Sequence, residues 1–569
     1  MKTFKYNIRH KGLRLLPFYL FTFLLLAASC SSDDDMTRLN TDPTKAPDVD
    51  ASSQLTTAEL QTYGDLGEVE LNRNYIYGFT QQLAGSWNTT NYGGRQMADD
   101  NEMQRMWTTW YNQSIKNLVD AINKTDGDET QANVNAASKI YFVYMMSVIT
   151  DTYGNVPYTE AGRGYINNIA NPKYDDQKDI YYNFFEKLDS AVQELNANGG
   201  KISSDVIYQG DITKWKKLAN SLRLRYAMRI SDVDPEKAQA EFTKALQADG
   251  GIIDNSSDDA LIHYMKVANS FGQESYTDYR RNAMSMLFFG NDPANNPSYI
   301  CSTFFNLMND SKDPRTFIFA RNYWDKIMNI STGENRIDVT AEVLAQGKEQ
   351  PNNPGGFSWE PWPSGFHSTY LDSLAQYNPD IKAQGTDLDR ECEPKLANNF
   401  LSNDNPGVVI TSAEVKFLLA EATSKGWISS YGSVADLYRE GVRASMDLLS
   451  DNYGTERVSD DDFNTFIQNN PVGYTAENQK RAINTQAYIL HFLDPNECWA
   501  NVRRSGYPQL QSASHYNFTL DPTSDGDDIP VRLKYPTLES SYNKANYNDA
   551  LQRMGGTDSW HTHVWWDVK

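Results

Sequence analysis

Cysteine is scarce in this chain and is not arranged for a metal or a disulfide scaffold. There are four cysteines, none of them in a CxxC pair or a histidine-rich cluster: Cys30, Cys301, Cys392 and Cys498. If Cys30 is set aside, three remain, so at most one internal disulfide can form, and its partners stay open. The sequence supports neither a zinc site nor a disulfide-stapled fold, and we expect no metal and no cofactor.

Positive charge is also in short supply. The chain has 52 Lys and Arg against 74 Asp and Glu, a formal net charge of −22. A protein this acidic repels phosphate groups, which argues against nucleic acid as a partner. The same balance is compatible with a neutral ligand.

Catalytic motifs are missing as well. No glycine-rich phosphate loop, HExxH or GxSxG stands in a suitable setting. A glycosidase needs two carboxylates about 5–10 Å apart across a cleft, and among so many acids the sequence does not locate such a pair. His561 and His563 lack a third metal ligand, so we interpret them as part of an exposed polar tail. We therefore predict no enzymatic activity.

The one long apolar run lies near the N-terminus. A basic stretch precedes it, Leu15 to Leu26 form it, and Ala27-Ala28-Ser29 lead to Cys30. This order predicts a secretory signal peptide over residues 1–29. The alternative, a transmembrane helix, is disfavoured because the run is short and strongly polar residues follow it.

The residues around Cys30 resemble a bacterial lipobox, in which the cysteine thiol is lipidated before cleavage. Leu26 stands four residues before the cysteine, where the commonest pattern has it three before. The run Ser31-Ser32-Asp33-Asp34-Asp35 resembles the surface-export signal of Bacteroidetes lipoproteins, although a solvated acidic tether would look the same. We expect a lipid anchor at Cys30 in the outer membrane, facing the exterior.

Apolar residues recur at three- and four-residue spacing over much of the remaining chain, which predicts a mostly α-helical fold. Residues 30–52 are expected to be a lipidated acidic tether and an extended segment, and 53–569 one domain with an irregular, loop-rich part at about 290–410. Helices are expected from about 53 and over 70–85, 101–124, 131–150, 178–196, 211–231, 235–248, 276–289, 411–424, 433–449, 474–493 and 543–553.

Two helical hairpins resemble tetratricopeptide units. One pairs 131–150 with 178–196, and the other runs from Thr411 to Leu449. Its first helix carries Phe417, Ala420 and Ala422 and its second carries Tyr438 and Gly441. Small residues at the crossing let the two helices approach, and an aromatic side chain fills the space beside them. On the predicted helix 211–231, Trp215, Leu218, Leu222 and Tyr226 share one apolar face and are expected in the core.

Several arginines have structural interpretations rather than functional ones. Arg223, Arg225 and Arg229 are expected to pair with acids of neighbouring helices. Arg503 and Arg504, before Gly506, are expected to cap carbonyls at a helix C-terminus.

A set of segments in a fixed order spans nearly the whole mature chain. They are Leu39–Lys45, Thr150–Tyr158, Lys214–Arg229, Asp313-Pro314-Arg315, Thr411–Ala422, Trp499–Pro508, Ile529–Pro536, Asn543–Asn548 with Met554-Gly555-Gly556, and Val564–Asp567. Together they resemble the SusD/RagB family of nutrient-binding outer-membrane lipoproteins. The resemblance implies a tetratricopeptide-like helical scaffold with a loop-rich ligand-binding region. It also implies a SusC-type TonB-dependent transporter as partner, and an oligosaccharide or other nutrient as ligand.

Candidate ligand-binding residues lie in loops, because helix faces bury their aromatic side chains. Flat rings suit the C–H faces of sugars, and polar groups suit the hydroxyls. The loop Gly85–Arg95 offers rings and polar partners, and its position matches a family loop that contributes to ligand binding; the stretch Phe357–Phe366 offers tryptophans held among prolines. The candidates are Trp87, Asn88, Asn91, Tyr92, Arg95, Trp359 and Trp362, with Trp324 as a weaker one. The alternative is that these rings pack loops onto the scaffold.

Three functions remain open on the sequence alone. The first is a binding lipoprotein that captures a glycan or other nutrient and delivers it to the transporter. The second is a surface glycoside hydrolase, and the third is a tetratricopeptide-type scaffold for protein assembly. The complete set of family segments favours the first.

Overall fold

The computed structural model describes residues 49–85, 88–267, 278–289, 298–324, 337–338, 340–341, 394–516 and 519–568. Residues 1–50 and 51–569 form separate units, and the elements below belong to the second. The first helix begins at Ala51, two residues before the expected start of the domain. Cys30, Cys392, Trp87, Trp359 and Trp362 lie outside the described residues.

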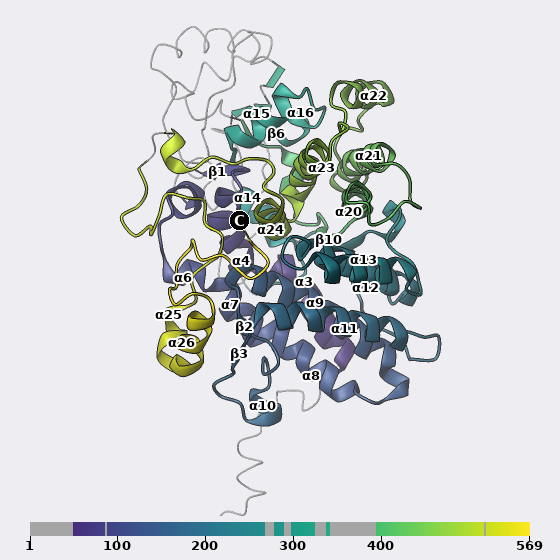
Figure 1. Cartoon of the computed structure of the whole chain (residues 1–569), viewed down its shortest axis with the longest axis vertical. Coiled ribbons are helices and arrows are strands. Elements are labelled where there is room, and N and C mark those ends of the chain that lie inside the picture. Colours follow the sequence, from purple (N-terminus) through teal and green to yellow (C-terminus); the bar gives the residue numbers. More distant parts are fainter. Residues whose placement is uncertain are drawn as a thin grey trace, which may run out of the picture. The chain divides into compact units, whose positions relative to one another are not determined.

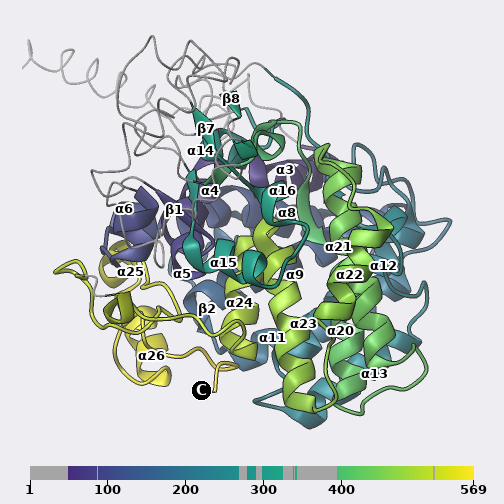
Figure 2. The same cartoon turned by 90° about the horizontal axis from the view of Figure 1, so that it is seen from above.

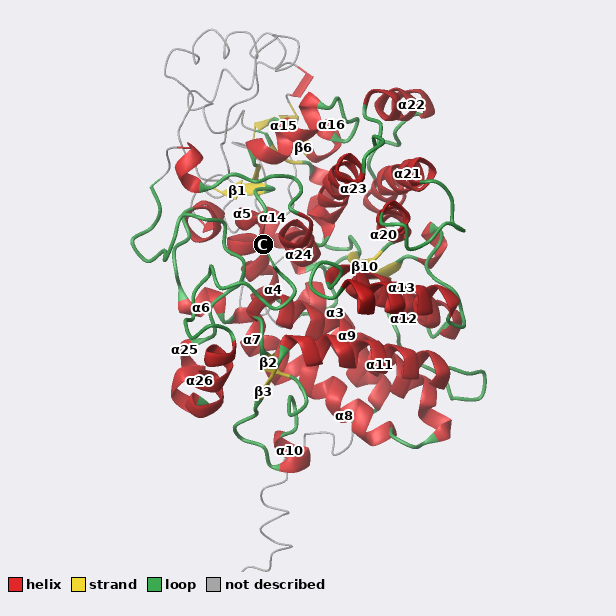
Figure 3. Cartoon of the chain, viewed as in Figure 1, coloured by secondary structure: helices red, strands yellow, loops and turns green. Residues whose placement is uncertain are grey.

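Helices dominate the described chain (Figure 3), which confirms the predicted fold class. The longer ones are α3 Ala51–Gly64, α8 Lys116–Thr125, α9 Ala132–Tyr153, α11 Gln177–Glu194, α12 Ile212–Arg229, α13 Pro235–Gln247, α15 Ser302–Asp310, α20 Ser412–Ser424, α21 Val434–Tyr453, α22 Asp460–Asn469, α23 Ala476–Leu490, α24 Pro495–Ser505 and α26 Lys544–Arg553. Shorter ones are α4 Leu66–Leu71, α5 Tyr77–Phe79, α6 Asp100–Met103, α7 Arg105–Thr109, α10 Gly164–Asn167, α14 Ala283–Phe289, α16 Thr316–Phe319 and α25 Thr537–Tyr542. None of the described helices is both long and apolar enough to cross a membrane.

Both expected helical hairpins are present, so the scaffold is tetratricopeptide-like. Helix α9 packs on α11, and α20 packs on α21, as Figures 1 and 2 show from two directions. At the second crossing, a Cβ on Gly441 would stand 2.6 Å from Cε1 of Phe417. That contact is shorter than side chains tolerate, so the glycine is what allows the two helices to meet there.

Helix α12 lies at the centre of this scaffold and confirms both expectations for its residues. Asp211 caps it by accepting hydrogen bonds from the amides of Thr213 and Lys214. Trp215, Leu218, Leu222 and Tyr226 are buried. The three arginines are buried too and pair with acids from other helices: Arg223 with Glu241 and Asp189, Arg225 with Glu414, and Arg229 with Glu497.

The irregular middle of the chain contributes three strands of a four-stranded sheet, whose order is β1-β5-β9-β6. Its strands are β1 Leu83–Gly85, β5 Ser298–Ile300, β9 Lys395–Leu396 and β6 Ala320–Arg321, all antiparallel to their neighbours. Three two-stranded pairs complete the sheets: β10 Gly407–Ile410 with β4 Ala260–Ile262, β2 Val156–Pro157 with β3 Tyr174–Asp175, and β7 Tyr323–Trp324 with β8 Ile337–Asp338.

Two expectations about elements were wrong. The helix expected over 70–85 ends at Phe79 and is followed by β1, because the chain turns at Gln81, which has a left-handed φ of 55°. Within the part expected to be loops and short elements, residues 302–310 form the regular helix α15, whose Phe304, Phe305 and Met308 are buried.

The C-terminal segment also differs from expectation. Rather than forming an exposed polar tail throughout, it packs against the scaffold, with Trp560, Val564 and Trp566 buried, while His563 is exposed as expected. His561 is half-buried, with its Nε2 3.4 Å from Asp525 Oδ1. The apolar residues interleaved with the two histidines explain the burial, since they have a core to reach.

The expectation that Arg503 and Arg504 cap carbonyls at a helix C-terminus is confirmed for Arg503 and wrong for Arg504. Arg503 donates to the carbonyls of Trp499 and of Asp151, the latter in the last turn of α9, and so caps a helix end as expected. Arg504 instead forms a two-pronged ion pair with Glu421 of α20, at 2.7 and 2.8 Å. A buried carboxylate within reach binds a guanidinium more strongly than a carbonyl does.

Candidate functional site

The loop that follows β1 is built by a close contact between two glycines. Residues 90–94 form a π-helical turn, a wide turn that occurs often at functional sites. A Cβ on Gly93 would stand 2.6 Å from the carbonyl oxygen of Tyr75 and 2.8 Å from Cα of Gly78. The turn can therefore sit directly on the helical segment before β1 only because both positions are glycine.

Two of the predicted polar residues meet in this turn. Arg95 donates from Nη1 to Oδ1 of Asn91 at 3.1 Å and from Nε to the carbonyl of Thr519 at 3.0 Å. Both side chains are half-buried, as is that of Asn88. The guanidinium is thus fixed in direction while part of it stays open to a ligand, which is how a site reduces the entropy lost on binding.

Residues 519–528, which the sequence analysis did not predict to be part of the site, contact this loop through hydrogen bonds. The amide of Asp521 donates to the carbonyl of Arg95 at 2.8 Å, and Gln96 Nε2 donates to the carbonyl of Asp528 at 2.9 Å. The hydroxyl of Thr523 accepts from the amide of Ala98 at 2.8 Å. Residues 519–528 therefore support the site, and no periodic or compositional signal marks them in the sequence.

Tyr92 does not offer the exposed ring expected of it. Its side chain is 9% exposed, and its ring centroid lies 5.5 Å from that of Tyr75. Tyr75 in turn contacts Trp560 at 6.0 Å. This ring therefore packs the turn onto the scaffold, which is the alternative role that the sequence left open.

The four-stranded sheet collects the segments that carry the tryptophan candidates. Strand β1 leads straight to Ser86 and Trp87, and β6 is followed by Trp324 in β7. Trp359 and Trp362 lie in the sequence between β8 and β9. In the sheet, Lys395 pairs with both Tyr299 and Arg321. Since neighbouring strands lie about 4.8 Å apart, the edge strands β1 and β6 are only about 14 Å apart.

The remaining tryptophans are committed to packing. The eight whose side chains the structure describes are all buried or half-buried: Trp107, Trp110, Trp215, Trp427, Trp499, Trp560, Trp565 and Trp566. The other four of the twelve are the predicted ligand residues Trp87, Trp324, Trp359 and Trp362. The first group lies in helices, in the turn after α20 and in the C-terminal segment.

Two acids of the supporting segment have lowered pKa values. Hydrogen bonds from the hydroxyl and the amide of Thr523 lower the pKa of Asp521. The pKa of Asp525 is lowered as well: burial alone would raise it, but Lys534 at 2.9 Å outweighs the burial. A general acid needs a carboxyl whose pKa is raised, and neither of these two carboxyls meets that need.

A buried cluster of Glu414, His491 and Glu497 has ligand atoms within 4.8 Å of one another. The carboxylates in it already have cations: Arg225 lies 2.6 Å from Glu414, and Arg229 contacts Glu497 at 2.5 Å. Two guanidinium groups in this space oppose a further positive charge. The cluster is therefore an ion-pair network of the scaffold.

Comparison with known proteins agrees with this fold. Residues 43–536 match the family model of SusD-like proteins described as "Starch-binding associating with outer membrane". A solved "Bacteroidetes AC2a SusD-like" structure is 46% identical, with a TM-score of 0.84 over 92% of this chain and 100% of the other. A structure named as a chitin-binding protein is 32% identical, with a TM-score of 0.72 over 91% of this chain and 100% of the other.

A more distant structure, a SusD homologue from Bacteroides vulgatus ATCC 8482, shares the fold at 21% identity, with a TM-score of 0.67 over 91% of this chain and 97% of the other. A search of functionally curated proteins gave no match. The family match covers most of the chain, and the first of these structures is close in sequence over its whole length. The protein therefore belongs to the SusD-like family of outer-membrane, carbohydrate-binding proteins.

Proposed function

We propose that this protein binds a glycan at the outer surface of the cell and delivers it to a SusC-type TonB-dependent transporter without altering it chemically. The observation that carries the ligand class is the 32% identical relative named as a chitin-binding protein, matched over its full length. Membership of a family described as starch-binding supports the same class.

The binding face is proposed to be the loop Gly85–Arg95 together with the segments that enter and leave the four-stranded sheet. Trp87, Trp359, Trp362 and Trp324 would stack on sugar rings. Asn88, Asn91 and Arg95 would bind hydroxyl groups, and the hydrogen bond between the last two fixes their directions before a ligand arrives. In this proposal Tyr92 acts from behind, by holding the turn on the scaffold.

Attachment to the membrane is proposed to be through a lipid on Cys30, after removal of residues 1–29. The acidic run Asp33–Asp35 would then direct the protein to the outer face. A protein anchored there by its N-terminus can stay beside a transporter while its binding face moves, which is what delivery requires.

Isothermal titration calorimetry with chitin and starch oligosaccharides tests the ligand and the site together. Trp87→Ala or Trp359→Ala should each lower the affinity for the bound glycan by about 1–3 kcal/mol, the usual weight of an aromatic hot spot, while the melting temperature stays constant. Tyr165→Ala is the matched control, because its ring is 93% exposed on α10 and away from the site.

The outcomes separate this function from the two alternatives. Release of free sugar from the same oligosaccharides would favour a glycoside hydrolase. Copurification with proteins other than an outer-membrane transporter, without glycan binding, would favour an assembly scaffold. If both tryptophan variants bind like the wild type, or if both unfold, these residues are packing residues and the site assignment is wrong.

A further inference from the structure

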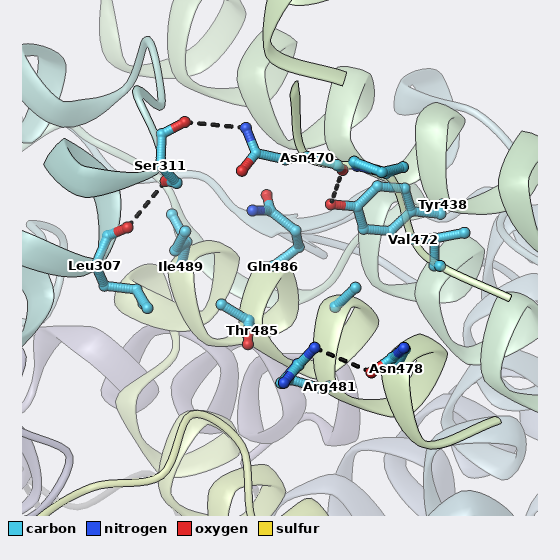
Figure 4. A pocket seen from close by; sticks show the side chains of 13 residues that line it. Leu307, Ser311, Tyr438, Asn470, Val472, Asn478, Arg481, Thr485, Gln486 and Ile489 are labelled. Carbon is cyan, nitrogen blue, oxygen red and sulfur yellow. Dashed lines mark hydrogen bonds between the residues drawn. The ribbon is translucent and has the colours of Figure 1, made fainter. Parts of the chain in front are cut away.

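A cavity separate from the candidate site lies between α15, α21 and α23. The turn that joins α22 to α23 closes it on one side. Its volume is about 310 Å³, at the lower end of the range for small-molecule sites. Figure 4 shows its lining, which includes none of the candidate residues described above: Leu307, Ser311, Tyr438, Asn470–Gly473, Asn478, Arg481, Ala482, Thr485, Gln486 and Ile489.

Gln486 presents a fixed hydrogen-bond donor to this cavity. Its side chain is 5% exposed, and its Oε1 accepts a hydrogen bond from Nη2 of Arg315. That guanidinium is itself held by Asp313, at 2.9 and 2.6 Å. Because the arginine can only donate, the amide of Gln486 cannot turn over. Its Nε2 has no acceptor among the described residues, and Figure 4 shows the amide amid the lining side chains.

Asn470 presents a fixed acceptor in the same way. Its Nδ2 donates to the carbonyl of Ser311 at 2.9 Å and to that of Phe466 at 3.0 Å. Both bonds require the nitrogen, so Oδ1 is left as a free acceptor in the part of the chain that the structure describes. A hydroxyl group both donates and accepts, and an oriented donor and acceptor on one cavity suit a ligand that carries several hydroxyls.

The rest of the cavity lining includes aliphatic side chains and one positively charged side chain, Arg481. Leu307, Val472 and Ile489 supply aliphatic surface for the C–H groups of a small ring. Arg481 is exposed and donates from Nη2 to Asn478 at 3.0 Å, which leaves most of its donors unused. No carboxylate lines the cavity, although the chain has 74 acids against 52 bases.

We propose that this cavity is a second binding site, which takes a single acidic sugar ring such as a uronic acid. The hydroxyls of the ring bond to Gln486 Nε2 and Asn470 Oδ1, and its carboxylate binds the guanidinium of Arg481. A planar guanidinium matches the geometry of a carboxylate. The inference goes beyond the proposed glycan site and holds whether or not that site binds chitin or starch.

The test uses the full soluble chain with methyl β-D-glucuronoside and, as the uncharged counterpart, methyl β-D-glucoside. Binding is followed by saturation-transfer NMR and calorimetry. We expect the glucuronoside to bind at least tenfold more tightly than the glucoside. Arg481→Gln should remove that preference. Gln486→Glu should weaken binding of the glucuronoside at least tenfold, because it places a carboxylate in the cavity that repels the carboxylate of the ligand.

Controls keep the result specific to this cavity. Arg439→Gln is the control for Arg481→Gln. Arg439 is also exposed and also donates to a side-chain amide, Asn464 Oδ1, but it does not line the cavity. The Arg439→Gln variant should bind the glucuronoside like the wild type. Trp87→Ala should also leave this binding unchanged. Equal binding of both sugars, no binding of either, unchanged preference in Arg481→Gln, or loss of binding in Trp87→Ala would each overturn the proposal.

Discussion

Arg225 of α12 and Glu414 of α20 form a two-pronged ion pair, with both nitrogen–oxygen distances at 2.6 Å and both side chains buried. The residues are 189 positions apart in the sequence. Arg225 also donates to the carbonyl of Val409, just before α20. This contact joins the first half of the helical scaffold to the hairpin of α20 and α21.

Arg225→Met should lower the free energy of unfolding by about 3–5 kcal/mol, because it leaves Glu414 buried without its cation. Urea unfolding followed by circular dichroism measures the change. Lys124→Met, which breaks the half-exposed pair with Asp120, should stay within about 1 kcal/mol of the wild type. Equal effects in the two variants would show that the buried pair contributes no more than a surface pair.

Gly93→Ala should destabilise the protein by roughly 1–3 kcal/mol, the usual cost of overpacking, and should weaken glycan binding as well. The added Cβ would meet the backbone of Tyr75 and Gly78, so the turn that carries Asn91 and Arg95 has to move. Thermal unfolding and calorimetry report the two effects. Gly164→Ala is the control, because the nearest atom to its Cβ would be 3.7 Å away. If the Gly93→Ala variant binds glycan with the affinity of the wild type, the turn is not part of the binding site.

Glu68 should make the protein less stable as the pH rises. Burial raises its pKa from 4.5 to about 8, and its Oε2 has no hydrogen-bond partner among the residues that the structure describes. The folded state therefore holds a proton that the unfolded state releases near pH 4.5. The contribution of this proton to the free energy of unfolding is fully present below pH 4.5 and is lost as the pH rises through about 8. Glu68→Gln should match the wild type at pH 5 and exceed it at pH 9, by on the order of a few kcal/mol.

Glu421 provides the opposite case for the same experiment. Burial alone would raise its pKa, but the ion pair with Arg504 outweighs burial and lowers the pKa to about 2. Its contribution to stability is present above pH 4.5 and is lost as the pH falls toward 2. Glu421→Gln should therefore be destabilised at neutral pH and approach the wild type in acid. Parallel pH profiles for the two glutamine variants would contradict the assignment.

Cys30→Ala should release the protein from the membrane. If the anchor is the lipid on this cysteine, the variant is neither lipidated nor found with outer membranes in cells that lack the transporter. Replacing Asp33, Asp34 and Asp35 by Ala should keep the lipid but reduce cleavage by protease added to intact cells. Wild-type cleavage of the triple variant would mean that the acidic run is a tether alone.

The scaffold was predictable because its signal is local and repeated. On α12, the spacing of Trp215, Leu218 and Leu222 placed the helix and its buried face, and the surplus of acids placed the partners of its arginines. The strand β1 was not predictable in this way. Leu83, Ala84 and Gly85 continue the apolar pattern of the helix before them, and only pairing with a strand more than two hundred residues later decides their conformation.

The site was partly predictable for a related reason. Asn91 and Arg95 were chosen as polar residues of one loop, and the π-helical turn at 90–94, which the sequence did not predict, brings them together. Tyr92 was assigned to the ligand because the chain does not reveal that Tyr75 and Trp560 cover its ring. The support from Thr519, Asp521 and Thr523 depends on contacts across the whole chain, and residues of these types occur in every surface loop.

The pairing of Arg321 with Lys395 has a consequence for how such proteins change. Partners in an antiparallel ladder have Cα atoms roughly 5 Å apart, so the chain leaves the sheet and returns to it at almost the same point. In the topology of the sheet, the stretch between these two residues is therefore an insertion between two paired strands. Exchange of that single stretch between relatives would carry Trp324, Trp359 and Trp362 with it, so the proposed ligand-binding side chains would change together while the strand pairing at its two ends stays the same.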